Sequence, residues 1–99
     1  MPVADAQTHL LFMVVEGFKD GDAAPVYERY RDQGRQLPEG VRYIDSWVSA
    51  DLTMCFQVME APDRARLDEW IVRWSDLIEF EVVEVLTSTQ AAEAVLLDA

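Results

Sequence analysis

The chain has 99 residues, 51% of them hydrophobic, and its 19 acidic and 8 basic side chains give a net charge of −11. This length fits a single domain, and the hydrophobic content excludes general disorder. Because an acidic surface repels phosphate backbones and anionic lipid headgroups, we expect neither nucleic-acid binding nor membrane-surface binding.

The scarcity of cysteine and histidine limits the possible chemistry. Cys55 has no partner for an intramolecular disulfide, and one cysteine with one histidine, His9, is too few ligands for a zinc site. No glycine-rich loop follows a predicted strand to hold a dinucleotide phosphate. We therefore expect no metal and no permanent cofactor. The longest apolar run, residues 10–15, is too short to span a membrane, and no signal-like segment opens the chain, which favours a cytoplasmic setting.

The first elements are a tail, a strand and a helix. Residues 1–7 show no periodicity and are expected to form a flexible tail. Residues 8–18 carry apolar side chains on both faces, which is typical of a central strand that is covered on both sides. After a turn over residues 19–22, Asp22 is positioned to cap a helix that has Pro25 in its first turn.

The middle of the chain reads as two strands and a second helix. Residues 41–48 and 52–60 are predicted strands, and their short connection indicates antiparallel pairing. Asp63 is the expected N-cap of a helix that runs to about Leu77. The apolar side chains of this segment recur at helical spacing, which indicates a core-facing stripe. The stripe consists of Leu67, Trp70, Ile71, Trp74, Leu77 and Ile78.

The remaining elements complete a recognisable order. Residues 79–86 are the fourth predicted strand, and Thr87 and Gln90 have the spacing of a capping box, which predicts a short C-terminal helix. The resulting β-α-β-β-α-β order predicts an α+β fold, a ferredoxin-like sandwich with two helices on one face of an antiparallel sheet, over residues 8–92. The first and third strands are apolar on both faces, so we expect two copies to pair sheet to sheet as a dimeric α/β barrel.

A candidate ligand site combines residues of the second and third strands. Tyr43, Asp45 and Trp47 alternate along a strand, which predicts that all three lie on one face. If that face is buried it indicates a pocket, and if it is wet it is an ordinary surface. Cys55 and Gln57 share a face of the third strand, where a buried amide needs a specific partner. We predict that these five residues bind a ligand if a turn register or a bulge brings the two sets together.

Other side chains receive simpler interpretations. Cys55 is expected to be a small buried hydrophobe rather than a nucleophile, because no cationic neighbour is evident. His9 is interpreted as a strand-edge residue rather than a base. Glu79 and Glu81 are interpreted as solvated carboxylates of an edge strand, although paired acids can perform acid–base chemistry.

Several motifs together carry a resemblance to a known family. These motifs are residues 25–27, 35–40, 43–48, 55–60, 67–70, 74–77 and 80–82. In combination they resemble a small bacterial family described only as domain of unknown function 3303, over roughly residues 10–92. The resemblance implies a ferredoxin-like fold and membership of the dimeric α/β-barrel group. It implies no reaction, ligand or catalytic residue, because fold does not determine function.

These observations leave alternative functions. The first is a homodimeric barrel that binds a small organic ligand through Tyr43, Asp45, Trp47, Cys55 and Gln57. The second is a cofactor-free enzyme, monooxygenase-like or isomerase-like, that acts on an aromatic or quinone-like substrate with Asp45 as acid/base. The enzyme requires an acid with a displaced pKa inside the cavity. The third is an interaction domain with a fully packed interior.

Overall fold

A computed structural model describes residues 9–97 of the chain. In chain order the elements are β1 (Leu10–Phe18), a short 3-10 helix (Lys19–Gly21), α1 (Ala24–Gln33), β2 (Arg42–Val48), β3 (Met54–Ala61), α2 (Arg64–Trp74), β4 (Ile78–Val85) and α3 (Ser88–Leu97). Each predicted strand and helix is present, with ends shifted by a few residues. The expected tail over residues 1–7 lies outside the described part of the chain.

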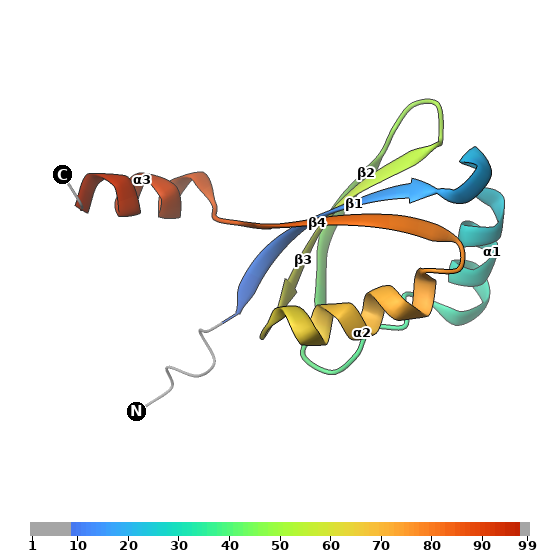
Figure 1. Cartoon of the computed structure of the whole chain (residues 1–99), viewed down its shortest axis with the longest axis horizontal. Coiled ribbons are helices and arrows are strands. Elements are labelled where there is room, and N and C mark those ends of the chain that lie inside the picture. Colours follow the sequence, from blue (N-terminus) through green and yellow to red (C-terminus); the bar gives the residue numbers. More distant parts are fainter. Residues whose placement is uncertain (1–8, 98–99) are drawn as a thin grey trace.

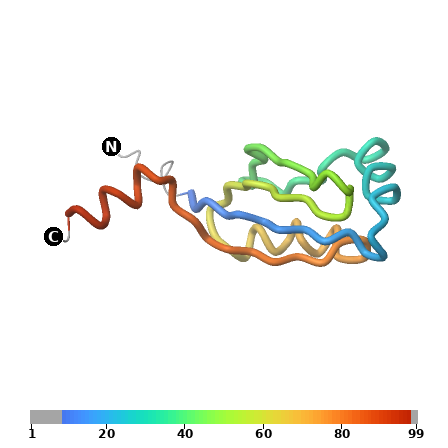
Figure 2. The backbone as a smooth tube through the Cα atoms, turned by 90° about the horizontal axis from the view of Figure 1, so that it is seen from above, coloured from blue at the N-terminus to red at the C-terminus, as the bar shows by residue number. Residues whose placement is uncertain are grey.

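The four strands form one antiparallel sheet with the order β2-β3-β1-β4. This order, with α1 and α2 as the crossovers, is that of a ferredoxin-like fold. Both helices lie on the same side of the sheet, and α3 extends away from it beyond the end of β4 (Figures 1 and 2). The sheet therefore has one face covered by helices and a second face, called the open face below.

The hydrophobic core lies between the sheet and the two helices. Strand alternation sends every second side chain of the central strands β1 and β3 into this layer. From α2, the predicted stripe contributes Leu67, Trp70 and Trp74, each no more than 4% exposed. The remaining buried apolar side chains are Phe12, Val14, Phe18, Val26, Val41, Cys55, Met59, Ala61 and Ile78.

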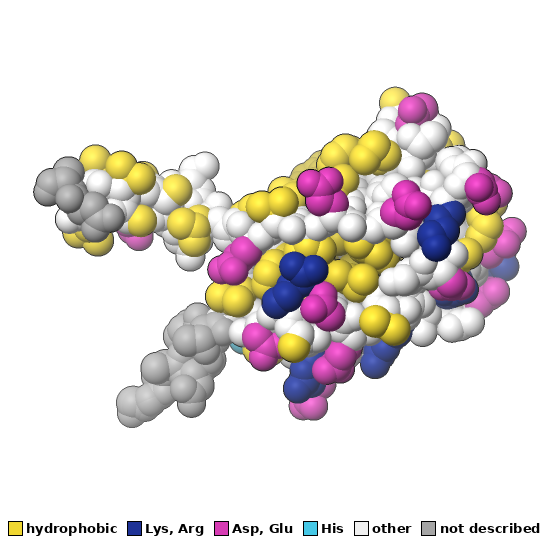
Figure 3. Space-filling model, in the orientation of Figure 1, with side chains coloured by type: hydrophobic (Ala, Val, Ile, Leu, Met, Phe, Trp, Pro, Cys, Tyr) yellow, Lys and Arg dark blue, Asp and Glu magenta, His cyan; other side chains and the backbone are white. Residues whose placement is uncertain are grey.

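The open face is apolar at its centre. Its side chains alternate with the buried ones along each strand, and Trp47 (57% exposed), Val83 (49%) and Phe56 (39%) are conspicuously exposed. Figure 3 shows hydrophobic side chains along this side of the body and around α3. The apolar members of the open face are Leu11, Met13, Val15, Trp47, Met54, Phe56, Val58, Val83 and Val85.

The predicted caps at Asp63 and Thr87 explain where α2 and α3 begin. At α1 the N-cap is Ala23 rather than the predicted Asp22, whose carboxylate accepts a 3.0 Å hydrogen bond from the backbone N–H of Ala24. The Asp63 carboxylate accepts a 2.8 Å hydrogen bond from the backbone N–H of Arg66, which confirms the N-cap of α2. At α3, the Gln90 side chain accepts from the Thr87 N–H at 2.9 Å, and the Thr87 hydroxyl accepts from the Gln90 N–H at 3.1 Å. This reciprocal pair is the predicted capping box. It fixes the start of α3, whose described side chains are otherwise largely exposed.

Candidate functional site

A pocket lies in the layer between the two helices and the sheet. Its cavity volume is about 90 Å³, and it is lined by residues of α1, α2 and all four strands together with the loop after α1. Most of the wall is apolar or aromatic, with a small number of polar groups, as is usual for sites that bind organic molecules. The lining residues are Glu16, Phe18, Val26, Tyr27, Tyr30, Arg35, Ser46, Cys55, Gln57, Trp70, Trp74 and Ile78.

Glu16 is the most unusual member of this lining. It points from β1 into the helix-covered layer, in line with Phe12, Val14 and Phe18, and is only 4% exposed. Its Oε2 atom is buried and has no hydrogen-bond partner among the described residues. Burial raises the pKa of Glu16 to about 7, although the positive charge of Arg35 partly opposes the rise. A carboxyl group that changes charge near neutral pH therefore lies inside the pocket.

Arg35 reaches the pocket because α2 holds its backbone in place. The indole N–H groups of Trp70 and Trp74 both donate to the Arg35 carbonyl oxygen, at 2.9 and 3.0 Å. The residue before it, Gly34, has a φ of 71°, a value that glycine adopts at little cost as the chain leaves α1. The two tryptophans thus fill the core, as predicted, and also fix the loop that presents the guanidinium.

The Arg35 guanidinium is held by aromatic rings rather than by an acid. It lies 3.6 Å from the ring centroid of Tyr43 and 4.9 Å from that of Tyr30. One of its N–H groups donates to the Tyr30 hydroxyl at 3.3 Å. Among residues 9–97, the ion pairs all involve other arginines. The Arg35 charge is therefore available to a ligand.

Cys55 and Gln57 both line the pocket from β3. The Cys55 side chain is 6% exposed, and burial raises the pKa of its thiol to about 12, with the nearby Glu16 adding to the rise. Burial of Cys55 is thus confirmed. Gln57 is equally buried, and its amide donates to the thioether sulfur of Met59 at 2.9 Å. Because a thioether is a weak acceptor, the amide retains capacity for a stronger partner.

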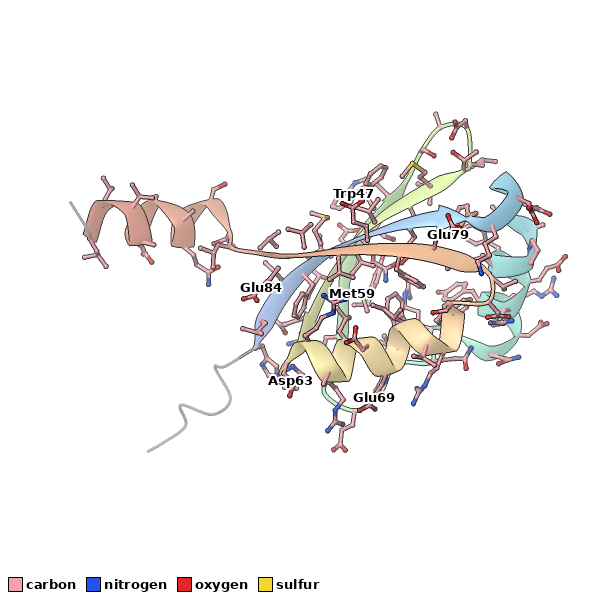
Figure 4. All side chains as sticks on the ribbon, in the orientation of Figure 1. Trp47, Met59, Asp63, Glu69, Glu79 and Glu84 are labelled. Carbon is pink, nitrogen blue, oxygen red and sulfur yellow. The ribbon has the colours of Figure 1, made fainter. Side chains whose placement is uncertain are left out.

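A β-bulge separates the three residues that were predicted to share a face of β2. Tyr43 pairs with Met59 and Asp45 with Val58, so the register shifts between them. Figure 4 shows Trp47 and Met59 on opposite sides of the sheet. The prediction that Tyr43, Asp45 and Trp47 lie on one face is therefore wrong. Only Tyr43 lies on the side of Cys55 and Gln57, whereas Asp45 and Trp47 lie exposed on the open face.

The bulge also brings in residues that sequence reasoning missed. Ser46 replaces Asp45 on the pocket side, and its hydroxyl is 2.7 Å from the Tyr43 hydroxyl. Glu16 was detectable as the single acid among the apolar side chains of a central strand. Arg35 had no comparable signal, because it lies in a loop and reaches the site only through contacts with α2.

Other candidates lie away from the pocket. His9 is exposed just before β1, and Glu79 and Glu81 are exposed on the open face of the edge strand β4. Within residues 9–97 no cluster of three or more His, Cys, Asp or Glu side chains is arranged to hold a metal ion. In the same part of the chain, none of the helices combines the length and apolar character needed to cross a bilayer.

The fold and the pocket define a ferredoxin-like α+β protein with a buried carboxyl group between its sheet and its helices. The chain belongs to the family described as "Domain of unknown function (DUF3303)", whose profile matches residues 10–96. No curated protein and no solved structure matches it.

Proposed function

We propose that the chain binds a small organic ligand, without a permanent cofactor, in the pocket beside the sheet. The observation that carries this proposal is the buried Oε2 atom of Glu16, which has no partner among residues 9–97. An unsatisfied buried polar atom costs roughly 1–3 kcal/mol, so a ligand that supplies a partner would recover this energy. Cys55, Gln57 and the ring of Tyr43 lie on this side of the sheet and remain proposed ligand contacts. Asp45 and Trp47 do not, because they lie on the open face.

Ligand binding can be tested with a defined set of single-ring carboxylic acids, phenols, amides and amines. Trp70 and Trp74 line the pocket, so a bound compound is expected to change tryptophan fluorescence as well as its own NMR signals. Ser46→Leu is expected to abolish binding by filling the pocket. Asp45→Leu introduces the same side chain one residue away on the opposite face and is expected to leave binding unchanged. Failure of every compound to bind the wild-type chain would contradict the proposal.

The pKa of Glu16 favours a second candidate function. A general acid or base works best when its pKa is close to the operating pH, and that of Glu16 is about 7. The chain would then be a cofactor-free enzyme, monooxygenase-like or isomerase-like, acting on an aromatic or quinone-like substrate. In this proposal Glu16 replaces Asp45 as the acid/base, because Asp45 is exposed on the other side of the sheet.

Proton transfer can be measured with cyclohexane-1,4-dione, a single-ring quinone-like ketone. The wild-type chain is expected to accelerate deuterium exchange at the carbons next to the carbonyls, and Glu16→Gln is expected to lose the acceleration. Glu81→Gln, which removes an exposed acid from the open face, serves as the control. If deuterium exchange in the presence of the wild-type chain were no faster than in buffer alone, the proposed enzymatic function would be contradicted.

We also propose that the partner of the chain is a second copy of itself, bound through the open face. The face has a central group of apolar side chains, with Arg42, Asp45, Glu79 and Glu81 toward its two edge strands. An apolar centre with a polar rim is the usual arrangement of a protein interface. We propose separately that the chain is cytoplasmic, because its one cysteine is a free buried thiol.

A further inference from the structure

We propose that the pocket accepts a small monoanion, namely a carboxylate on a group no larger than a single ring. Arg35 would bind the negative charge, and Glu16 in its protonated form would donate a hydrogen bond to the same carboxylate. This inference rests on the proposed ligand-binding function and names the chemical class of the ligand.

The first support is the free positive charge of Arg35. Arg35 is the only arginine or lysine among the pocket-lining residues, and Glu16 is the only aspartate or glutamate. The described carboxylates that form ion pairs do so with other arginines. A guanidinium that is stacked on two tyrosine rings keeps its orientation and can bind a carboxylate through two parallel N–H groups.

The second support is the unpartnered oxygen of Glu16. As a protonated acid this group has one O–H donor, and a ligand carboxylate is a strong acceptor for it. Besides Arg35, the titratable side chains that line the pocket with Glu16 are Cys55, Tyr27 and Tyr30. Burial raises the pKa values of Cys55 and Tyr27, the first to about 12. Cys55 and Tyr27 therefore stay neutral at physiological pH. With Glu16 protonated the lining carries one net positive charge, which suits a monoanion.

The third support is the size and shape of the pocket. An apolar cavity of about 150 Å³ is large enough to hold benzene. The pocket here, at about 90 Å³ and with aromatic walls that include Trp70 and Trp74, has room for a short acid or for part of one ring. A larger ligand would have to extend out of it.

The test compares anions with neutral molecules of the same shape. Affinities for benzoate and benzamide, and for propanoate and propanamide, are measured by calorimetry and by tryptophan fluorescence with the wild-type full chain. At pH 6 at least one carboxylate is expected to bind tenfold or more tightly than its amide, because charge-assisted hydrogen bonds are lost in the amide.

The pH dependence tests the role of Glu16. Benzoate and propanoate stay ionised between pH 6 and pH 8.5, whereas Glu16, with a pKa of about 7, loses its proton over this range. Since the anion requires the protonated acid, its affinity is expected to fall by roughly 30-fold between these pH values. Glu16→Gln keeps a neutral N–H donor and is expected to bind the carboxylate with little pH dependence.

Two arginine variants test the source of the selectivity. Arg35→Gln is expected to reduce the carboxylate preference to within about threefold, since the charge-assisted contacts are lost. Arg29→Gln is the matched control, because Arg29 lies 5.4 Å from the Trp74 ring but is paired with Asp76 and does not line the pocket. It is expected to keep the preference.

The outcomes separate this inference from the proposed function. Equal binding of carboxylates and amides would overturn the anion class and leave the ligand site intact. Carboxylate affinity that does not fall between pH 6 and pH 8.5 in the wild-type chain would overturn the role of protonated Glu16. If none of the single-ring carboxylic acids, phenols, amides and amines bound to the wild-type chain, the proposed function itself would be overturned. The wild-type measurements decide these points even if a variant fails to fold.

Discussion

Glu16 should make the stability of the chain depend on pH in the neutral range. Its folded-state pKa of about 7 is raised above the ordinary value of 4.5, so the folded state binds the proton more tightly than the unfolded state. The resulting stabilisation is fully present below about pH 4.5 and is lost as the pH rises through 7. Between pH 5 and pH 8 the expected loss is roughly 2–3 kcal/mol of unfolding free energy.

This loss can be measured by urea denaturation at a series of pH values. The difference in unfolding free energy between the wild-type chain and Glu16→Gln is expected to change by roughly 2–3 kcal/mol across that range, because glutamine cannot ionise. Glu81→Gln removes an exposed carboxylate from β4 and is expected to run parallel to the wild type. Parallel curves for Glu16→Gln would show that Glu16 does not titrate in this range.

Cys55 is expected to be inert in the native protein. Burial raises the pKa of its thiol to about 12, so the reactive thiolate is scarce at neutral pH, and the side chain is only 6% exposed. A thiol reagent whose absorbance changes when it reacts should therefore label Cys55 only at the rate at which the protein unfolds. Val72→Cys places a second thiol at a position that is 73% exposed and should add one fast equivalent. Fast labelling of the wild-type chain would instead identify Cys55 as a candidate nucleophile.

At the scale of the elements, α2 is expected to contribute strongly to stability. Trp74 is 4% exposed, and its indole N–H also holds the carbonyl of Arg35. Trp74→Ala is expected to cost about 3–5 kcal/mol, because it leaves a cavity and removes that hydrogen bond. Trp74→Phe keeps an aromatic ring but loses the indole N–H donor. The loss of this one hydrogen bond should cost about 1 kcal/mol, in addition to any loss of packing.

Chemical denaturation measures both changes. Val72→Ala lies on the exposed side of α2 and provides the control, for which a change of less than about 0.5 kcal/mol is expected. An unchanged midpoint for Trp74→Ala would mean that this indole contributes little packing energy, despite its burial.

Element by element, local patterns were sufficient to place the helices. The caps at Asp63 and Thr87 act through residues three positions away, so sequence spacing alone reveals them. The apolar stripe of α2 likewise depends only on helical period. The bulge between Tyr43 and Asp45 could not be read in this way, because a regular alternation of side chains contains no mark of one extra residue.

At the scale of the whole molecule, the open face is expected to pair with that of a second copy. Size-exclusion chromatography with light scattering should give twice the chain mass at micromolar concentration. Phe56, at the centre of the face and 39% exposed, pairs with Trp47 on β2 and Val15 on β1. Phe56→Glu is expected to yield a folded monomer, because a charge buried at an apolar interface is costly.

Val72→Glu is the matched control for this experiment, because it adds the same charge to the exposed side of α2. It should remain dimeric. A well-folded wild-type monomer at these concentrations would contradict the sheet-to-sheet barrel.

The sequence by itself determined the order of the elements, the central position of β1 and β3 and the burial of Cys55, Trp70 and Trp74. Each of these follows from the periodicity and polarity of residues that are only a few positions apart in the sequence. Only the tertiary structure decided which polar groups meet. Glu16 and Arg35 come from a strand and a loop 19 positions apart, and they share a pocket because Trp70 and Trp74, far along the chain, hold the Arg35 carbonyl. Contacts of this kind depend on packing between elements, which local sequence patterns do not encode.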